Sequence, residues 1–312
     1  MELIRGLVNL KARHRGCVAS IGNFDGVHLG HRSILRKLAM CGRELNLPAA
    51  VVTFEPTPQE YFNPAAPPAR LMTLREKYQM LAQCFVGRLL CLRFDRALAG
   101  MPAETFIERV LVEGLGVQQV VVGGDFRFGH GRAGDFSLLQ AAGERYGFGV
   151  SAAPAVTQAG ARISSTRIRA SLAVGELDAA AQMLGRPFAL SGRVIYGAGL
   201  GRRLGFPTAN IALRRKVAPV RGIFVARVHS GEGKPHYGAA YVGSRPALGG
   251  TRTVLEVFLF DFDGALYGRR LKVELLARLR DDAHFENLDA LREQINRDVQ
   301  AARAWLHGHR PE

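Results

Sequence analysis

The feature of this 312-residue chain that most constrains its fold is an alternation, through its first half, of apolar strand-like runs with amphipathic helical segments. Residues 18–21, 49–54, 89–94 and 117–122 are apolar almost throughout, as expected of strands that are buried on both faces. Helical patterns lie between these runs, and parallel strands need such crossovers. The alternation therefore predicts a doubly wound parallel sheet covered by helices on both faces.

One of these helices is well marked in the sequence. Thr73 and Glu76 have the spacing of a capping box. Four apolar residues then recur at helical spacing and are expected to share one buried face; they are Leu74, Tyr78, Leu81 and Phe85.

From Phe188 onward the pattern changes to short extended runs that are separated by glycine and proline, without helical segments between them. Such runs predict a small antiparallel β-barrel. They span residues 188–196, 206–213, 222–229, 237–242, 253–262 and 271–279. Asp263-Gly264 has the composition of a hairpin turn and is expected to join the last two runs.

The chain closes with an amphipathic helical pattern. Its apolar stripe, which we expect to pack on the barrel, consists of Leu288, Leu291, Ile295, Val299, Ala302 and Leu306. Because the pattern changes at Gly185-Arg186-Pro187, the sequence predicts two domains, residues 1–186 and 187–312.

The charge of the chain favours anionic ligands in general. The formal net charge is +15, but only six of the 42 basic residues are lysines and the arginines are spread along the whole chain. An arginine-rich surface attracts anions in general, nucleotide substrates included. Because the basic residues form no tail and no block interleaved with aromatic residues, the charge is weak evidence for nucleic acid, and we expect no nucleic-acid partner.

The cysteines and the hydropathy pattern indicate the cell compartment. The four cysteines form no CxxC pair and no ligand-like spacing with histidine, so we expect reduced thiols and no structural zinc site; they are Cys17, Cys41, Cys84 and Cys91. The sequence shows no signal-peptide pattern and no apolar run long enough to span a bilayer. These features predict a cytoplasmic protein without a membrane partner, and they leave self-association open.

Residues 21–31, Ile-Gly-Asn-Phe-Asp-Gly-Val-His-Leu-Gly-His, lie where the first strand gives way to a helix. The first amides of a helix lack partners and carry the positive end of its dipole, which favours a bound anion. His28 and His31 are on one side of the first turn. They could donate hydrogen bonds to nucleotide phosphates, bind a metal ion or be ordinary turn residues.

Two further groups in the first domain have both a structural and a functional interpretation. The segment 163–169, Ile-Ser-Ser-Thr-Arg-Ile-Arg, could cap a helix through its hydroxyls, or could cradle phosphates with Arg167 and Arg169. Phe126 and Phe128 flank an arginine in a glycine-rich loop, where they could pack in the core or contact a flat aromatic substrate.

In the second domain, strand alternation places Glu256 on the same face as Val254, Phe258 and Phe260. A carboxylate among apolar neighbours is costly unless it is paired or used, so Glu256 is a candidate general base. Upstream, a glycine-rich loop precedes Thr208 and Asn210, whose oxygens suit Mg²⁺ shared with ATP.

These motifs, taken in order, resemble those of the bacterial bifunctional riboflavin kinase and FMN adenylyltransferase (FAD synthetase) family. The resemblance covers essentially the whole chain and implies a nucleotidyltransferase-type domain followed by a riboflavin kinase barrel. The matching motifs are GNFDGVHLGH at 22–31, TFEP at 53–56, GGDFRFG at 123–129, ISSTRIR at 163–169, GRRLGFPTAN at 201–210, LEVFLFDFDG at 255–264 and LYGRRL at 266–271.

For the first domain the resemblance implies transfer of AMP from ATP to FMN, which yields FAD and pyrophosphate. His28 and His31 are the implied catalytic residues. The implied ATP-binding residues are Gly22, Phe24, Asp25, Gly26, His28, His31, Ser164, Thr166, Arg167 and Arg169. The implied flavin-binding residues are Asn23, Asp125, Phe126 and Phe128.

For the second domain the resemblance implies phosphorylation of riboflavin to FMN by ATP and Mg²⁺, with Glu256 as the catalytic base. Thr208 and Asn210 are the implied metal ligands. The implied ATP-binding residues are Gly201, Arg202, Gly205, Pro207, Thr208 and Asn210. The expected partners are therefore riboflavin, FMN and ATP.

The chain departs from the family pattern at three positions. Thr57 replaces a usual histidine, Tyr241 a frequent asparagine and Ala247 a frequent threonine. Two alternative functions follow from weaker interpretations of the same residues. One is an FMN adenylyltransferase with a degenerate kinase domain, and the other is a basic RNA-binding protein on a nucleotidyltransferase scaffold.

Overall fold

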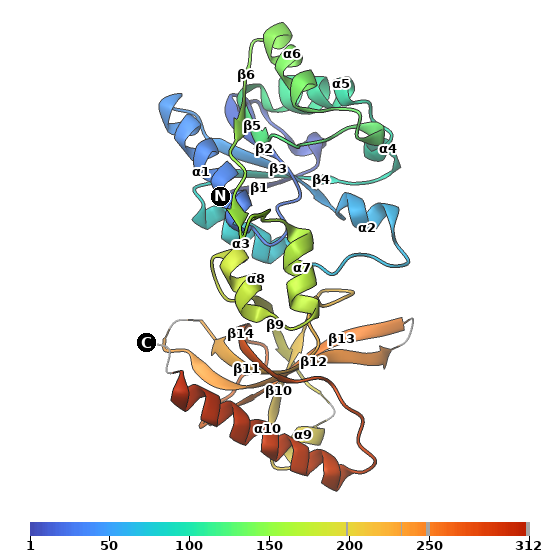
Figure 1. Cartoon of the computed structure of the whole chain (residues 1–312). Coiled ribbons are helices and arrows are strands. Elements are labelled where there is room, and N and C mark those ends of the chain that lie inside the picture. The colour runs from blue at the N-terminus through green and yellow to red at the C-terminus, as the bar shows by residue number, and fades with distance from the viewer. Residues whose placement is uncertain (198, 232, 248–249, 310–312) are drawn as a thin grey trace. The chain divides into compact units, whose positions relative to one another are not determined.

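The computed structural model describes residues 1–197, 199–231, 233–247 and 250–309. The chain forms two compact units (Figure 1). The first comprises residues 1–68 and 74–164, and the second comprises residues 69–73 and 165–312. Within the described part of the chain, no helix combines the length and the apolar character that a membrane span requires.

The first unit is built on a six-stranded sheet of order β1-β4-β3-β2-β5-β6, in which every pairing is parallel. The strands are β1 (Glu2–Arg5), β2 (Cys17–Ile21), β3 (Ala49–Glu55), β4 (Arg88–Arg93), β5 (Val117–Gly123) and β6 (Gly149–Ala153). The predicted doubly wound parallel sheet is confirmed. The sequence pattern missed β1, a four-residue edge strand with only one buried residue.

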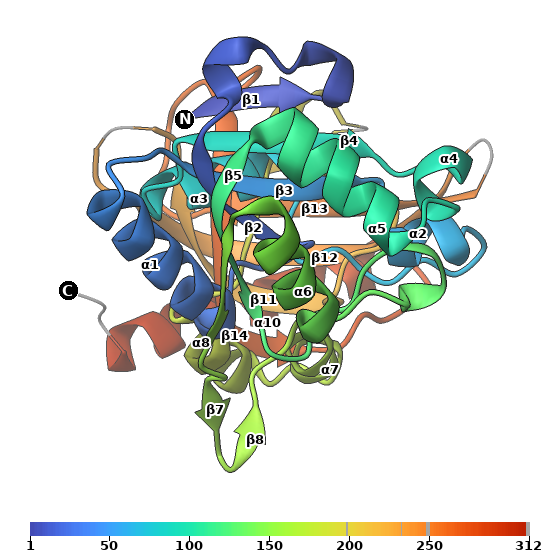
Figure 2. The same cartoon turned by 90° about the horizontal axis from the view of Figure 1, so that it is seen from above.

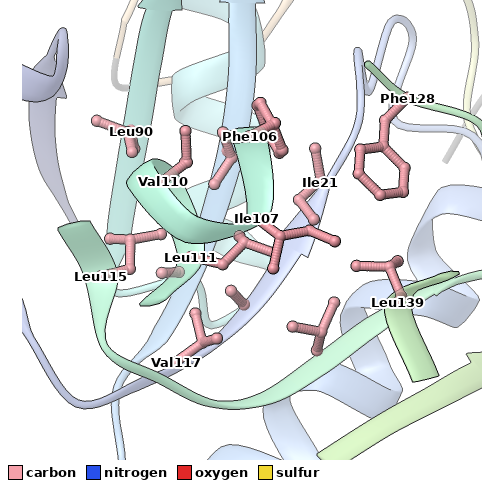
Figure 3. Packing of buried hydrophobic residues seen from close by; sticks show 14 of the residues in the cluster. Ile21, Leu90, Phe106, Ile107, Val110, Leu111, Leu115, Val117, Phe128 and Leu139 are labelled. Carbon is pink, nitrogen blue, oxygen red and sulfur yellow. The ribbon is translucent and has the colours of Figure 1, made fainter. Parts of the chain in front are cut away.

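Helices cover both faces of this sheet. Those of the first unit include α1 (Leu29–Glu44), α2 (Pro58–Phe62), α3 (Leu74–Gln83), α4 (Arg96–Ala99), α5 (Ala103–Phe106), η3 (Ile107–Leu115) and α6 (Phe136–Tyr146). On one face η3 and α6 pack against alternate strand residues, among them Ile21 and Leu90 (Figure 3). Helix α1 contacts β2, β3 and β5, and Figure 2 shows it apart from α5 and α6.

The predicted helix after Thr73 is present as α3, but one of its residues was assigned wrongly. Leu81 is buried as expected, whereas Phe85 lies beyond the end of the helix and is 84% exposed. Its backbone has a φ of 61°, in the left-handed region that L-residues seldom adopt. Helical periodicity placed Phe85 on the buried face because periodicity alone does not locate the last turn of a helix.

The second unit contains a closed antiparallel barrel of order β10-β13-β12-β11-β14-β9. Its strands are β9 (Ala189–Ile195), β10 (Thr208–Ala212), β11 (Gly222–His229), β12 (His236–Ala247), β13 (Gly250–Leu259) and β14 (Arg270–Arg280). The predicted six-stranded barrel is confirmed.

The hairpin predicted at Asp263-Gly264 is wrong. Strand β13 pairs with β10 and β12, whereas β14 pairs with β11 and β9. The connection that contains these two residues therefore crosses from one part of the barrel to another. A two-residue turn signal describes local backbone preference and cannot specify which strands pair.

Helix α10 (Leu288–Gly308) packs on the outside of the barrel, as its stripe predicted. Val299 and Ala302 form a cluster with Val225 and Phe260, while Leu288 at the start of the helix is 54% exposed. Arg280 in β14 and Asp298 in α10 form a two-pronged ion pair, with Nε–Oδ1 and Nη2–Oδ2 distances of 2.8 and 2.7 Å.

Two helices that precede the barrel in sequence group with it. They are α7 (Ser165–Ala173) and α8 (Leu177–Leu184), and α8 contacts β14. The compact second unit thus begins before residue 186, the position at which the sequence pattern changes. The division of function at residue 186 stays a prediction.

Candidate active sites

The glycine-rich stretch of the first unit forms the connection from β2 to α1, at the carboxyl end of the sheet. Phe24 and Val27 in this connection have φ values of 47° and 39°, although neither is glycine. Phe24 is 1% exposed. Backbone strain at buried residues persists only where the surroundings hold it, and such strain is concentrated at functional sites.

The two histidines of this stretch lie together. His28 is the N-cap of α1, and its Nδ1 accepts a hydrogen bond from the His31 amide at 3.3 Å. The two rings stack with centroids 3.7 Å apart. Because Nδ1 of His28 is an acceptor, the neutral ring carries its proton on Nε2 and can donate it to a ligand.

His31 is held in its neutral form. Burial, together with the neighbouring His28, Lys77 and Arg162, lowers the pKa of His31 well below its usual range. Lys77 is only 2% exposed, and its Nζ donates to Thr53 Oγ1 at 3.2 Å. Asp25, from the same connection, is also buried.

Sequence reasoning missed Lys77 and Arg162 as members of this site. A signal for Lys77 was available, because it lies three residues after Leu74 and four before Leu81, on the apolar stripe of α3. A lysine at such a position is costly unless it meets an acceptor. Arg162 carried no comparable signal, because its position depends on the chain returning beside Asp125.

The proposed flavin-side residues separate into core and accessible groups. Phe128 is 7% exposed and packs against Phe106, which favours a core role. Phe126 is half-buried and stacks on Phe128 with centroids 5.3 Å apart. Asp125 pairs with Arg162, and this hydrogen bond lowers the pKa of Asp125.

Asn23 and Thr57 also belong to the first unit. Within the described residues the Oδ1 of Asn23 is shielded from solvent and has no hydrogen-bond partner. Thr57 is the N-cap of α2 and forms a capping box with Glu60. Its departure from the family's histidine is therefore compatible with a structural role.

The segment that contains the predicted hydroxyls and arginines, residues 163–169, is divided between the two units. Ser164 ends the first unit, whereas Thr166, Arg167 and Arg169 lie on α7 in the second. Arg169 donates from Nε to the Ala69 carbonyl at 2.7 Å. Closure of this cluster over the triphosphate stays a prediction.

In the barrel, strand register brings together residues that are far apart in sequence. Glu256 in β13 lies directly opposite Asn210 in β10, and Thr208 is two residues from Asn210 on the same face. Glu256 is half-buried on the outer face of the barrel, whereas Leu255 and Val257 point inward and are fully buried. The Oε1 oxygen of Glu256 is shielded from solvent.

The glycine-rich loop lies against the same oxygens. A Cβ at Gly197 would come within 2.4 Å of the Asn210 amide, and one at Gly201 within 3.0 Å of Thr208 Oγ1. Only glycine permits this approach of the loop backbone. The other predicted ATP-binding residues of the barrel, Arg202, Gly205 and Pro207, are exposed beside it.

The donor set of the barrel site fits a magnesium ion. Thr208 and Asn210, the predicted ligands, offer oxygens on one strand, and the carboxylate of Glu256 lies opposite on the neighbouring strand. The described residues contain no group of three or more histidine, cysteine or acidic side chains that could form a metal cage. Mg²⁺ characteristically uses few protein oxygens, together with water and substrate phosphates.

Tyr241, a departure from the family pattern, is the other strand neighbour of Glu256. Its hydroxyl donates to Asp282 Oδ2 at 2.9 Å. Ala247 is at the end of β12, and its side chain lies outside the described part of the structure.

Comparison with known proteins assigns a family to each part of the chain. The family model for FAD synthetase matches residues 10–167, and that for riboflavin kinase matches residues 184–306. A bifunctional riboflavin kinase/FMN adenylyltransferase from Escherichia coli K12 is 49% identical over 307 residues, which cover 98% of each chain. Proteins of the same name from Pseudomonas fluorescens and Haemophilus influenzae are 48% and 45% identical, and the matches cover at least 97% of each chain.

A solved structure extends this similarity to the fold. The crystal structure of a protein from Streptococcus pneumoniae that is described as a macrolide-efflux protein aligns with a TM-score of 0.83 and 28% identity. The alignment covers 98% of this chain and 100% of that one. From the two family models and the full-length relatives, the chain belongs to the family of bifunctional riboflavin kinases/FMN adenylyltransferases.

Proposed function

We propose that this chain converts riboflavin to FMN at the barrel site and FMN to FAD at the site in the first unit, with ATP as co-substrate of both. One observation carries the proposal: each unit has its own group of polar side chains beside a glycine-rich connection. These groups are the histidine pair of α1 and the Glu256–Asn210 pair of the barrel. A cytoplasmic location, where ATP is available, accompanies this proposal.

At the barrel site Glu256 accepts the proton of the terminal ribityl hydroxyl of riboflavin as that oxygen attacks the γ-phosphorus of ATP. The P–O bond to ADP breaks, and FMN is the product. The backbone of the glycine loop holds the phosphates beside Thr208 and Asn210. Mg²⁺, when bound by these oxygens and the phosphates, neutralises negative charge during the transfer.

In the first unit a phosphate oxygen of FMN attacks the α-phosphorus of ATP, and pyrophosphate leaves. Because the FMN phosphate is already a nucleophile, the protein needs to supply position and charge stabilisation rather than a base. The Nε2–H of His28 and the buried ammonium of Lys77 are suited to the phosphates. Asn23, Asp125 and Phe126 are proposed for the flavin side, and Ser164, Thr166 and Arg167 for the triphosphate.

The test is a time course of the full chain with riboflavin, ATP and Mg²⁺, in which FMN and FAD are separated by chromatography. FMN should appear first and FAD should follow at its expense. Formation of neither flavin nucleotide would contradict the proposal. Omission of Mg²⁺ with added chelator should stop riboflavin phosphorylation, and full activity under that condition would contradict the metal assignment.

A further inference from the structure

The first unit contains a cavity that the two chemical steps do not use. It lies between α1 and α3 and has a volume of about 910 Å³. Pro48 and Ala49 at the start of β3, and Gly87 just before β4, contribute to its wall. These residues lie at the amino edge of the parallel sheet, opposite the carboxyl edge where the His28 connection is found.

One wall of the cavity is a stripe of three arginines on α1, Arg32, Arg36 and Arg43. Residues four and eleven positions apart differ by only about 40° and 20° around a helix, so the three side chains share one face. They extend over about 16 Å at 1.5 Å per residue. None of them forms an ion pair with a carboxylate among the described residues. A stripe of this kind is suited to a ligand with more than one negative charge.

Arg32 is incompletely satisfied in the described part of the chain. Its Nη2 donates to the thioether sulfur of Met80 at 3.7 Å, and sulfur is a weak acceptor. Its Nε is shielded from solvent and has no hydrogen-bond partner. A buried donor without an acceptor is costly. Because this nitrogen is shielded, a shift of the Arg32 side chain would be needed for it to donate to an anion in the cavity.

Apolar residues also line the cavity. They include Leu47 and Met80, and Phe85 is a further lining residue. Phe85 is 84% exposed and has a φ of 61°. The chain thus leaves a large aromatic ring in solvent at a residue whose backbone conformation is also unfavourable. A flat ring stacked on Phe85 would bury this surface.

We propose that this cavity is an accessory binding site for a nucleotide, with the phosphates on the arginine stripe and the planar ring on Phe85. A volume of about 910 Å³ is within the range of roughly 300–1,000 Å³ usual for small-molecule sites. The combination of one aromatic face with one cationic wall favours a nucleotide over an acidic peptide, which would need no exposed ring. FMN, FAD and ATP, which this family handles, have this chemistry.

The first experiment counts FAD-binding sites by titration calorimetry on the full chain. Arg36→Glu/Arg43→Glu should bind one FAD fewer than the unmodified chain. The control Arg96→Glu/Arg109→Glu changes the net charge equally at exposed positions of the same unit and should retain every site. Both flavin-forming activities at saturating substrate should persist in both variants, since none of these four residues belongs to either proposed active site.

The second experiment changes Phe85 to asparagine, which tolerates the left-handed backbone. The affinity of the accessory site for FAD should fall about tenfold, the order expected for loss of one stacked ring, while the unfolding midpoint should not fall. An unchanged number of FAD sites in Arg36→Glu/Arg43→Glu, or an equal loss in the control pair, would overturn the proposal. The proposal would also be overturned if a polyglutamate peptide bound in a manner that requires Arg36 and Arg43 while the binding of FAD did not require them.

Discussion

His31 connects the geometry of the proposed phosphate site to the stability of the first unit. Because burial and neighbouring cations lower its pKa well below 6.5, the folded protein keeps His31 neutral when the unfolded chain would already bind a proton. The unfolded state then binds more protons as the pH falls below about 6.5. The contribution of His31 to the free energy of unfolding must therefore decrease with acidification through that range.

We predict that His31→Gln reduces this loss of stability between pH 7 and pH 5. One proton contributes at most about 1.4 kcal/mol per pH unit. The measurement is urea unfolding at a series of pH values, with the difference between variant and wild type plotted against pH. A difference that does not change with pH would show that His31 titrates normally in the folded protein.

Glu256 should separate the two activities. Glu256→Gln retains the shape of the side chain but cannot accept a proton, so we expect riboflavin phosphorylation to fall at least about a hundredfold, the usual contribution of a general base. FAD formation from supplied FMN should remain within about twofold. The same substitution at the exposed Glu286 of the same unit should affect neither activity. Equal loss of both activities in Glu256→Gln would contradict the assignment.

At the scale of elements, the strands could be predicted where burial on both faces of the sheet requires a run of apolar residues in the sequence. The strands β2 to β5 are such cases, because most of the residues in each are apolar. The edge strand β1 and the partners of β13 could not be predicted in this way. Strand pairing depends on tertiary packing, which a local turn signal such as Asp263-Gly264 does not contain.

In the candidate sites, too, residues marked by a local sequence pattern were predicted, and residues whose role depends on tertiary packing were not. His28, His31, Thr208 and Asn210 were predicted because each is near a glycine-rich connection in the sequence. Lys77 was not predicted. Its place on the apolar stripe of α3 indicated a buried lysine, but its neighbours at the site depend on how α3 packs beside the loop that precedes α1. Asp298 was not predicted either, since it adjoins the apolar stripe of α10 and its partner Arg280 is on a strand.

We predict that Asp298→Asn weakens the attachment of α10 to the barrel. The change leaves the half-buried Arg280 without its counter-charge, and we expect the free energy of unfolding to fall by about 2 kcal/mol. The exposed pair Arg297–Glu293 on the same helix is the control, and Glu293→Gln should cost less than about 0.5 kcal/mol. Urea unfolding followed by the fluorescence of Trp305, which packs in the same cluster, reports both. Equal effects of the two substitutions would exclude a special role for the buried pair.

At the scale of the whole molecule, the two chemistries are linked by FMN, the product of one and the substrate of the other. A variant that has lost one of the two activities should retain the other, provided that the chain still folds and the changed residues serve only one site. Glu256→Gln should make FAD from FMN only, and His28→Ala/His31→Ala should make FMN from riboflavin only. Neither variant alone should convert riboflavin to FAD.

We predict that a mixture of these two variants restores the full conversion, because FMN released by one chain can diffuse to another. FAD should appear after a lag, and the lag should shorten as the concentration of Glu256→Gln is raised, since that variant consumes the FMN pool. The measurement is chromatographic separation of riboflavin, FMN and FAD over time, with each variant alone as control. The contrary outcome is a mixture that accumulates free FMN and forms no FAD, even though Glu256→Gln alone adenylylates supplied FMN at the same concentration. That result would contradict the model of two independent sites that share a free intermediate.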